Sequence, residues 1–435
     1  MLIDPEMMGL NLALRAQDAG HEVILSIPKD KDRKPSQVGD GLVQKTRNWQ
    51  EKMRWADLVV MTGNGRWSND IEPYFKKGFP IFGPNQQCAE LELNRVYGQQ
   101  VLKTCGIETM PYTEFDNYDD AEAFVRKTLK RYVSKPHGDR DRALSYVSKN
   151  PADMVYMLQR WKRNRPAQEG FMLQEFVSGV EFAVGGWFGP CGWVGPWCES
   201  FEHKKLMAGE LGVNTGEMGT AVKYVKQSIF AEQVLKPLEE VLHALNYVGY
   251  VDVACIIDKK GRPRPLEFTA RMGWPLFHIQ LSLHQGDPVN WMADLLQGKD
   301  TLKTSMDHSV GVVVTLPDFP YSHATRKEVV GVPVYGISKE NRDCIQPAML
   351  QKGKVPCMNG DRLTEKELFV SADDYLFIVT GQGKTVKQAK KRSYDVLDEI
   401  EIPNSPMWRT DISDKLETAI PELQKFNFAG DWTFG

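Results

Sequence analysis

Hydrophobic residues near the start of the chain occur in short runs separated by amphipathic stretches. The segment LNLALRAQDAG at 10–20 has helical spacing, whereas strand-like runs are HEVILSI at 21–27, DLVVM at 57–61 and PIFG at 80–83. This alternation is typical of a parallel sheet with crossover helices. We therefore predict a Rossmann-like α/β domain over residues 1–85.

The pattern changes after residue 85. Long helices are predicted over 86–105 and 228–245, and the apolar runs FMLQEF, EFAVGGWF and GWVGPWCES predict an antiparallel meander. The strands GYVDVACIID and RPLEF are joined by KKGRP, which is a good hairpin turn. Beyond residue 300, SVGVVVTL, ELFVS and YLFIVTG predict a β-rich region with a closing helix.

Composition excludes several classes of protein. A chain of 435 residues exceeds one typical core, so several domains are expected. Its net charge of -3 provides no basic footprint for nucleic acid, and its seven cysteines without CxxC spacing favour a reducing compartment. The sequence has no apolar run of membrane-spanning length and no signal-peptide pattern, so we expect a cytoplasmic protein that contacts no membrane.

Two carboxylates stand on the two strands of the predicted hairpin. Strand alternation puts Asp252 on one face of the first strand, and the second strand can bring Glu267 close to it. Adjacent carboxylates repel unless a cation lies between them, and Mg²⁺ takes one or two carboxylates plus phosphate oxygens. The pair indicates a magnesium site or, equally, two acidic residues that meet on a sheet without a ligand.

Charged side chains elsewhere fit a nucleotide. Arg271 follows Glu267 by four residues, where a guanidinium neutralises a transferred phosphoryl group or forms a surface salt bridge. Lys135 follows an apolar strand in YVSKP, where a cation can reach nucleotide phosphates. Glu175 in FMLQEF is placed to contact an adenine edge, and Glu181 in SGVEF is placed to contact a ribose or a lysine. Each of these signals is weak by itself.

The order of these features resembles the ATP-grasp superfamily, and most closely the phosphoribosylamine–glycine ligases. The segments that carry the resemblance are IFGPNQQCAELELNRVYGQQVLKTCGIETMPYTEF, LQEFVSGVEF, EHKK with GVNTGEMG, LEFTARMG, and PMWRTDIS. Several matches in the same order over most of the chain are more specific than any single motif.

The resemblance implies an ATP-grasp fold, which is α/β with an α+β lid, between an N-terminal Rossmann-like domain and a C-terminal β-rich domain. The expected ranges are 1–85 for the N-terminal domain, 86–119 for a linker helix and the start of the ATP-grasp region, 120–185 for the lid, 186–305 for the central domain with the metal site, and 306–435 for the C-terminal domain. Such enzymes use ATP and Mg²⁺ to phosphorylate a carboxylate, and an amine then attacks the acyl phosphate. Small-molecule substrates are therefore implied, with glycine as the carboxylate by analogy. The protein is expected to be a monomer or homodimer that does not bind nucleic acid.

The resemblance also implies roles for individual residues. The implied catalytic residues are Arg271, Lys205, Asn214 and Thr215, and the implied ATP-binding residues are Lys135, Gln174, Glu175, Phe176, Val177 and Glu181. The implied substrate-binding residues are His203, Lys204, Gly216, Glu217 and Met218, and the implied metal ligands are Asp252, Glu267 and Thr269. The loop 202–219 would supply donors around an oxyanion and positive charge around phosphates, or would be a polar surface loop made rigid by glycines.

The segments that bind phosphate depart from the family pattern. The N-terminal glycine-rich loop of the family corresponds here to IDPEMMGLNLA, in which Asp4 and Glu6 would repel a phosphate. The lysine-glycine phosphate loop corresponds to KPHGDRDRALSYV, which keeps Gly138 but has Arg140 or Arg142 in place of its second lysine. The amine acceptor is therefore expected to differ from phosphoribosylamine.

Three further positions depart from the pattern beside the implied metal site. Thr269 replaces a metal-binding asparagine, and Trp274 stands in GWPL where the family has two carboxylates. Glu217 replaces a glycine and adds a negative side chain that can face a cationic amine. Taken together with the altered phosphate segments, these changes indicate that the ATP-binding half of the site is loosely kept and that the phosphoribosyl-binding half is altered.

We favour an ATP-dependent carboxylate–amine ligase with an altered acceptor, and two alternatives stay open. A catalytically degenerate ATP-binding homologue would explain Thr269 and the thinned phosphate loop, whereas Asp252 and Glu267 favour retained catalysis. A ligase that attaches an amino acid to a nucleotide or base would need a basic, aromatic-lined groove. The candidate segments RYVSKPHGDRDR and RWKRNR are charge runs, which are usually solvated faces.

Overall fold

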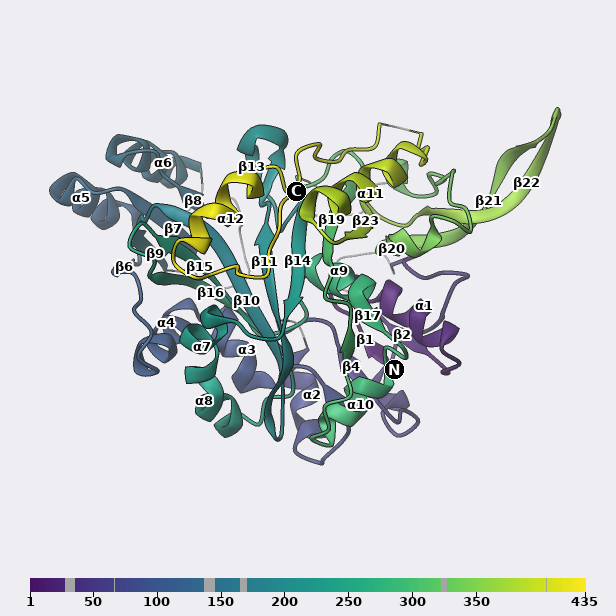
Figure 1. The fold of residues 1–435 in the computed structure, drawn as a ribbon, viewed down its shortest axis with the longest axis horizontal. Coiled ribbons are helices and arrows are strands. Elements are labelled where there is room, and N and C mark those ends of the chain that lie inside the picture. Colours follow the sequence, from purple (N-terminus) through teal and green to yellow (C-terminus); the bar gives the residue numbers. More distant parts are fainter. Residues whose placement is uncertain (28–35, 66, 137–144, 165–169, 322–326, 404) are drawn as a thin grey trace.

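The computed structural model describes residues 1–27, 36–65, 67–136, 145–164, 170–321, 327–403 and 405–435 (Figure 1). Gly138, Arg140 and Arg142 of the phosphate loop lie outside these ranges. Within the described ranges, no helix has the length and apolar character needed to cross a membrane.

The N-terminal region forms the predicted parallel sheet, with five strands in the order β3-β2-β1-β4-β5. The strands are β1 (Leu2–Ile3), β2 (Ile24–Ser26), β3 (Gln44–Thr46), β4 (Val59–Met61) and β5 (Ile81–Phe82), and the helices are α1 (Leu10–Asp18) and α2 (Ser68–Phe75). The strand order reverses between β1 and β4, which are paired in parallel through Leu2 and Val60. Ligands of open α/β sheets bind at such a switch point, beyond the carboxyl ends of the strands.

A four-stranded antiparallel sheet lies in the middle of the sequence, in the order β6-β9-β7-β8. Its strands are β6 (Tyr112–Phe115), β7 (Tyr132–Pro136), β8 (Tyr146–Val147) and β9 (Phe171–Glu175), and its helices are α5 (Tyr118–Thr128) and α6 (Pro151–Asn164). The two helices pack on the sheet through a separate small core that includes Tyr118, Trp161 and Phe171. We call this unit the small sheet domain; in Figure 1 it projects from one side of the molecule.

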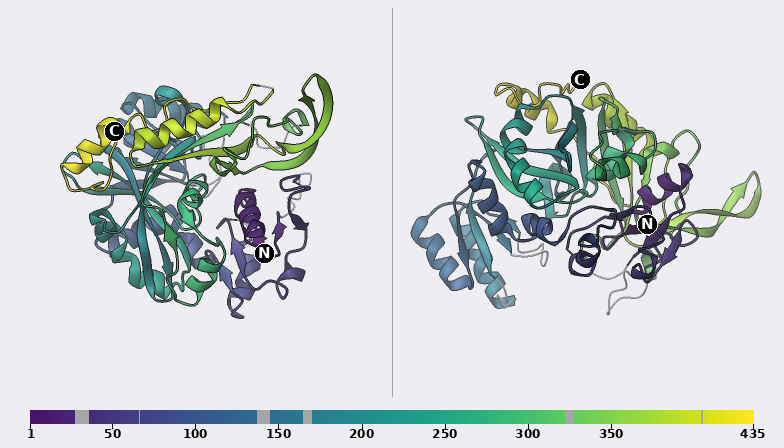
Figure 2. Two further views of the ribbon diagram at one scale, coloured as in Figure 1. Left: turned by 45° about the vertical axis from the view of Figure 1, so that its right-hand side comes forward. Right: turned by 90° about the horizontal axis from the view of Figure 1, so that it is seen from below.

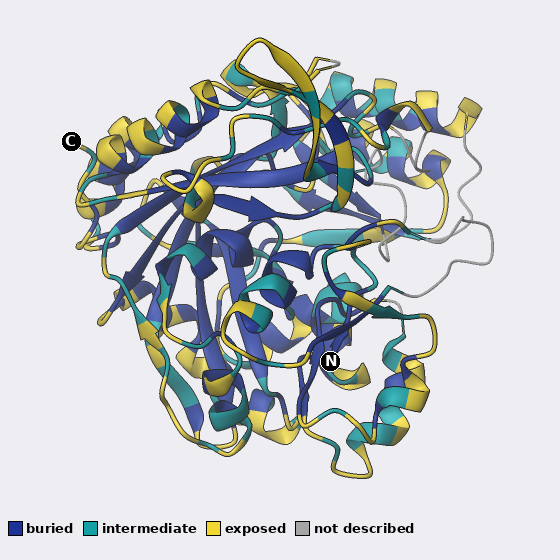
Figure 3. Ribbon diagram, turned by 90° about the vertical axis from the view of Figure 1, so that its right-hand side faces the viewer, coloured by how far each residue is buried: buried dark blue, intermediate teal, exposed yellow. Residues whose placement is uncertain are grey.

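An eight-stranded antiparallel sheet forms the centre of the molecule, in the order β16-β15-β10-β11-β14-β19-β23-β20. The strands are β10 (Gly179–Gly189), β11 (Gly192–Glu202), β14 (Gly219–Val225), β15 (Gly249–Asp258), β16 (Pro263–Thr269), β19 (His308–Thr315), β20 (Ile345–Pro347) and β23 (Tyr375–Gly383). The predicted meander is therefore wrong at one point, because FMLQEF pairs in the small sheet domain and not with EFAVGGWF. The C-terminal region adds β19, β20 and β23 to the same sheet, and Figure 3 shows the buried residues running along it.

Three two-stranded sheets complete the set of described strands. They are β12 (Lys205–Met207) with β13 (Leu211–Asn214), β17 (His284–Gln285) with β18 (Lys303–Thr304), and β21 (Leu350–Asn359) with β22 (Arg362–Ser371). The last pair extends away from the body of the molecule as a long arm in both views of Figure 2. The first pair belongs to the loop that carries many of the predicted site residues.

Both long helices predicted from the sequence are interrupted. The first is α3 (Gln86–Leu93) and α4 (Arg95–Thr104), because the Asn94 side chain accepts a hydrogen bond from the backbone N–H of Tyr97 and caps a new helix. The second is α7 (Ile229–Val234), a 3-10 turn (Lys236–Leu238) and α8 (Glu239–Ala244), with Pro237 in the turn. The remaining α-helices are α9 (Leu276–Leu283), α10 (Asn290–Leu296), α11 (Val386–Asp398) and α12 (Leu416–Gln424).

The C-terminal end is fixed to the central sheet through a buried carboxylate. Trp432 donates a hydrogen bond of 2.9 Å from Nε1 to Glu199 on β11, and Ser228 donates from its hydroxyl to the other oxygen at 2.6 Å. Burial raises the pKa of Glu199 to about 7, although these two hydrogen bonds act in the opposite direction. The proton is therefore bound more tightly in the folded protein than in the unfolded chain.

The variant Glu199→Gln should change how stability depends on pH. Because the folded pKa is raised, the stability associated with this proton is present at low pH and is lost as the pH rises towards 7. Between pH 5 and 7, urea unfolding should show wild type losing roughly 1 to 3 kcal/mol more than Glu199→Gln. Equal losses in the two proteins would contradict a protonated Glu199.

Candidate active site

The predicted metal ligands lie on one face of the central sheet. Asp252 on β15 is opposite Thr269 on β16, and Glu267 is opposite Ala254, two pairs further along the same hairpin. The predicted hairpin therefore brings these side chains together. Asp252 is 2% exposed, and its Oδ1 has no hydrogen-bond partner among the described residues. Burial and the charge of Glu202 raise the pKa of Asp252 well above its usual range.

Glu267 is held by cations. Its carboxylate pairs with Arg95 Nη1 at 2.5 Å and with Lys204 Nζ at 3.5 Å. Burial acts to raise the pKa of Glu267, but Arg95, Lys204 and Lys135 outweigh it and keep the pKa below its usual range. The two carboxylates of the hairpin thus differ, since Glu267 is neutralised by protein cations and Asp252 is not.

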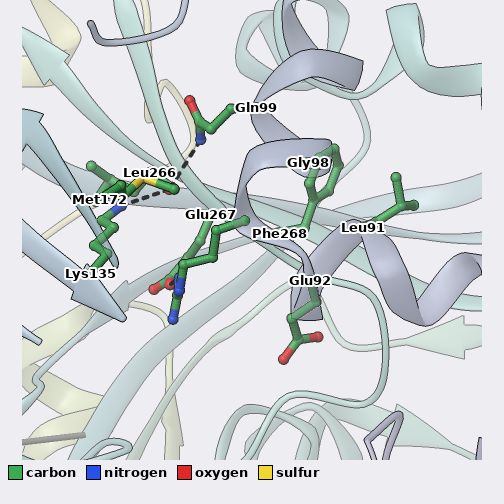
Figure 4. A pocket seen from close by; sticks show the side chains of 10 residues that line it. Leu91, Glu92, Gly98, Gln99, Lys135, Met172, Leu266, Glu267 and Phe268 are labelled. Atoms are coloured by element: carbon green, nitrogen blue, oxygen red, sulfur yellow. Dashed lines mark hydrogen bonds and ion pairs between the residues drawn. The ribbon is translucent and has the colours of Figure 1, made fainter. Parts of the chain in front are cut away.

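A pocket lies beside Glu267, between the small sheet domain and the central sheet (Figure 4). Its lining residues are Leu91, Glu92, Arg95, Gly98, Gln99, Lys135, Met172, Leu266, Glu267 and Phe268. Lys135 extends from β7 into it and donates a hydrogen bond of 2.8 Å from Nζ to the Leu266 carbonyl oxygen. Burial lowers the pKa of Lys135 to about 8. Lys135, predicted to reach nucleotide phosphates, and Glu267, a predicted metal ligand, thus line the same pocket.

The other predicted nucleotide residues follow from β9 into β10. Gln174 is buried with its Nε2 unpartnered among the described residues, and the exposed Lys130 pairs with Glu175 at 2.5 Å. Phe176 has the guanidinium of Arg131 over its ring at 3.4 Å from the centroid. Val177 is half-buried in the segment between the two sheets. Their binding of adenine stays a prediction.

Lys204 is the most heavily engaged cation of the site. Its Nζ lies 2.7 Å from Glu181, 3.2 Å from Glu202 and 3.5 Å from Glu267. Burial favours the neutral amine, but these carboxylates raise the pKa of Lys204 well above its usual range. Lys204 therefore remains charged and links a predicted ribose contact, Glu181, to the predicted metal ligand Glu267.

The loop 203–218 is closed by its own backbone. Thr215 donates to the Lys204 carbonyl oxygen from its backbone N–H at 2.8 Å and from its hydroxyl at 2.9 Å. The N–H of Met218 donates to the His203 carbonyl oxygen, and the Met218 side chain is fully buried. Lys205 and Asn214 are paired across β12 and β13, while Gly216 is exposed at the turn that follows. Thr215 and Met218 thus have structural partners, and catalytic or substrate roles for these residues stay predictions.

The C-terminal segment holds this loop in place. Arg409, whose side chain is 1% exposed, donates to both carboxylate oxygens of Asp411 at 2.8 Å, to Glu210 at 2.9 Å and to the Lys205 carbonyl oxygen at 3.0 Å. Asp411 also accepts the N–H of Gly209 at 2.9 Å. The matched segment PMWRTDIS therefore holds the loop 203–218 through the side chains of Arg409 and Asp411.

His203 is locked in one protonation state by the same segment. Its Nε2 accepts the backbone N–H of Ser413 at 3.0 Å, so the proton of the neutral ring is on Nδ1. Burial, together with Lys415 and Arg409, lowers the pKa of His203 well below its usual range. The residue is 1% exposed, so His203 is packed in the interior at the base of the loop.

Arg271 connects the hairpin to the N-terminal sheet. Its Nη2 lies 3.2 Å from Glu92 on α3, and Glu92 accepts the N–H of Ala270 at 2.9 Å and the side-chain amide of Asn64 at 2.7 Å. Sequence reasoning gave no role to Glu92 and Arg95, although both stand in the matched helix segment ELELNR. Both residues lie in the helix segment that carries the family resemblance, and this position was the signal that could have identified them.

The N-terminal loop places the side chain of Asp4 at the switch point of the parallel sheet. Asp4 follows β1, is fully buried, and accepts the backbone N–H groups of Met8 at 3.1 Å and Gly9 at 2.8 Å. Thr62, which follows β4, donates its hydroxyl to the same carboxylate at 2.6 Å. Burial raises the pKa of Asp4, although these three donors act to lower it. The donors at the start of α1 are therefore occupied by a side chain of the protein.

The donor set of the hairpin fits a magnesium ion. Mg²⁺ takes one or two carboxylates and completes its shell with phosphate oxygens and water. Asp252 provides an unpartnered oxygen and Glu267 an ionised carboxylate, whereas Thr269 lies opposite Asp252 and acts to lower its pKa. Among the described residues, no three His, Cys, Asp or Glu side chains are arranged to hold a metal by themselves. The site therefore fits a cation that arrives with a nucleotide.

Comparison with known proteins shows which proteins the chain resembles in sequence and fold. A family model described as the ATP-grasp (A) domain of phosphoribosylglycinamide synthetase matches residues 93–276. The phosphoribosylamine–glycine ligase of Ralstonia nicotianae is 25% identical over 355 residues, which cover 79% of this chain and 80% of the relative. The crystal structure of phosphoribosylamine–glycine ligase from Thermotoga maritima matches with a TM-score of 0.68 at 18% identity, covering 94% of this chain and 99% of that chain.

A more distant neighbour shares the fold. The biotin carboxylase domain of the 2-oxoglutarate carboxylase from Hydrogenobacter thermophilus, solved with magnesium ADP, ADP and bicarbonate, has a TM-score of 0.62 at 11% identity and covers 98% of each chain. The expected ATP-grasp fold is thus confirmed, with Lys135 and Glu267 lining one pocket. The chain thus has the ATP-grasp fold, matches the ATP-grasp (A) domain of phosphoribosylglycinamide synthetase over residues 93–276, and resembles phosphoribosylamine–glycine ligase.

Proposed function

We propose that this protein joins a small amino acid to an amine that carries no phosphate. ATP phosphorylates the carboxylate to an acyl phosphate, and the amine then displaces the phosphate to form an amide. Glycine is the proposed carboxylate, because phosphoribosylamine–glycine ligase is the name of the curated relatives. The acceptor is proposed to differ from phosphoribosylamine.

The buried carboxylate of Asp4 carries the proposal about the acceptor. A phosphate at the start of α1 would need the N–H groups of Met8 and Gly9, which already donate to Asp4. A phosphate would also have to approach the Asp4 carboxyl group itself, which accepts hydrogen bonds from Met8, Gly9 and Thr62. The Asp4 side chain therefore occupies the N–H donors that a phosphoribosyl group would need at this position.

Cationic side chains support the phosphoryl-transfer step. When bound, Mg²⁺ would be held by Asp252 and Glu267 and would neutralise charge on the nucleotide phosphates. Lys135, Lys204 and Arg271 add positive charge on the same side of the sheet, where charge develops on the transferred group. In the second step the amine nitrogen forms a bond to the carbonyl carbon, the carbon–oxygen bond to phosphate breaks, and the nitrogen loses a proton.

The acceptor is tested by competition between amines. With glycine, ATP and Mg²⁺, we expect ADP release to be faster with phosphate-free amines than with phosphoribosylamine. In Asp4→Ser, where Met8 and Gly9 lose their carboxylate acceptor, phosphoribosylamine should gain relative to the other amines. Thermal unfolding would establish that Asp4→Ser folds, since the loss of a buried acceptor costs about 1 to 3 kcal/mol. Glycinamide ribonucleotide as the best product of the wild type would contradict the proposal.

A further inference from the structure

Glu92 connects three elements of the candidate site. It lies on α3 and lines the pocket beside Glu267 (Figure 4). One of its oxygens, Oε2, accepts the side-chain amide of Asn64 at 2.7 Å and the backbone N–H of Ala270 at 2.9 Å. The other oxygen, Oε1, lies 3.2 Å from Nη2 of Arg271. The carboxylate thus receives neutral donors on one oxygen and faces a guanidinium with the other.

The two donors to Oε2 come from packed parts of the fold. Asn64 is 4% exposed and follows β4, the strand at the switch point of the parallel sheet. Ala270 is fully buried and directly follows β16, the strand that carries Glu267. Because these two hydrogen bonds reach the same oxygen from different elements, they restrict rotation of the carboxylate and hold Oε1 beside Arg271.

The guanidinium of Arg271 is held at two of its nitrogens. Nη2 pairs with Glu92, and Nη1 donates to the Met272 carbonyl oxygen at 2.8 Å. Arg271 follows Thr269, which is paired with Asp252, so the chain leaves the hairpin at the end that carries this predicted metal ligand. A long arginine side chain loses conformational freedom when it is fixed in one position, and a pre-positioned partner keeps it there.

Glu92 differs in this respect from two other carboxylates that were predicted to belong to the site. Glu217 is 5% exposed and Asp252 is 2% exposed, and each has one oxygen without a hydrogen-bond partner among the described residues. Both oxygens of Glu92 have partners within the protein. The contacts of Glu92 therefore suit a residue that holds a protein side chain in place and does not itself bind a ligand.

We propose that Glu92 is a positioning residue for phosphoryl transfer, and that it holds the Arg271 guanidinium where charge develops on the transferred phosphoryl group. The inference rests on the proposed function, in which Arg271 adds positive charge at this step. A carboxylate repels a phosphoryl group, so Glu92 acts through Arg271 and not by contact with the nucleotide. Its removal should therefore lower the rate of phosphoryl transfer more than the affinity for ATP.

The variant Glu92→Gln separates this role from a structural one. A glutamine oxygen can still accept the hydrogen bonds of Asn64 and Ala270, but the glutamine nitrogen then places N–H donors beside the Arg271 guanidinium. With ATP, Mg²⁺, glycine and the best amine of the competition measurement, kcat should fall about 10- to 100-fold while KM for ATP changes by less than about twofold. Glu90→Gln, a matched change at an exposed glutamate on α3, should retain the wild-type kcat.

A double variant shows whether Glu92 acts only through Arg271. In that case Glu92→Gln combined with Arg271→Ala should have the same kcat as Arg271→Ala, because residues that act as a unit are not additive. Multiplied losses in the double variant, or an unchanged kcat in Glu92→Gln, would overturn the inference. Asn64→Ala, which removes one donor to Oε2, serves if Glu92→Gln does not fold, and it should lower kcat in the same way.

Binding of a phosphoryl analogue tests the inference without turnover. MgADP with aluminium fluoride mimics the phosphoryl group during transfer. Isothermal titration calorimetry on the full chain should show this complex binding at least about tenfold more weakly to Glu92→Gln than to wild type, with equal MgADP affinity in the two proteins. Equal affinity for the analogue, or weaker binding of MgADP itself, would overturn the inference. A wild type that binds the analogue but releases no ADP with glycine and any amine would contradict the ligase activity and leave the positioning of Arg271 standing.

Discussion

The variant Glu267→Ala is expected to lose ATP turnover by more than about a hundredfold, the upper range for residues that only orient a metal ligand. The change removes one of the two carboxylates that fit Mg²⁺, and it leaves Arg95 without its 2.5 Å partner. Lys204 would lose one of its three carboxylates as well. ADP release with saturating ATP, Mg²⁺ and glycine measures the effect.

Two further variants make this expectation specific. Asp252→Ala should be nearly as severe, because the unpartnered oxygen of Asp252 is lost from the same face of the sheet. Glu240→Gln, at an exposed position of α8, should retain wild-type turnover. Unchanged ADP production in both hairpin variants would remove the metal site from this hairpin.

The second large effect is expected at Arg409. Its buried guanidinium joins Asp411, Glu210 and the Lys205 carbonyl oxygen, so Arg409→Ala leaves these groups without the only cation among these contacts. Because the side chains of Asp411 and Glu210 are 25% and 53% exposed, water can solvate them in the variant, and urea unfolding should show a loss of about 1 to 3 kcal/mol rather than the larger cost of a fully buried pair. The loop 203–218 would lose its attachment at the same time.

Comparison with other arginine changes isolates the cause. Arg409→Lys should recover only part of the stability, since an ammonium cannot match the forked hydrogen bonds to Asp411. Arg342→Ala removes an exposed arginine and should change the unfolding free energy by less than about 0.5 kcal/mol. A similar small change for Arg409→Ala would mean that the loop is held by other contacts.

Local patterns in the sequence predicted the parts of the fold that are local. The parallel N-terminal sheet and the hairpin of β15 and β16 both follow from alternation and turn residues close to each other in the chain. The assignment of FMLQEF to a different sheet from EFAVGGWF was not predictable in this way, because periodicity does not specify which strand is the neighbour. The break at Asn94 was missed because a capping asparagine inside an apolar pattern looks like an ordinary helical residue.

The site shows the same division. Asp252 and Glu267 were predicted together because they share a hairpin, whereas Arg95 reaches Glu267 from a helix far away in the sequence. The acidity of the N-terminal loop was evident from the sequence. The hydrogen bonds that Met8, Gly9 and Thr62 donate to Asp4 were not, because they depend on the pairing of β1 with β4. Contacts of this kind require the tertiary structure.

The anchoring of the loop by Arg409 and of Glu199 by Trp432 has a consequence for synthesis of the protein in the cell. Chains fold progressively as they leave the ribosome, and the N-terminal parts fold first. The residues that fasten the loop 203–218 and cover β11 follow their partners in the chain by 204 and 233 positions. Asp252, Glu267 and Lys204 therefore leave the ribosome before the residues that hold the loop around them, so the candidate site can assemble only after Arg409 and Trp432 have been synthesised.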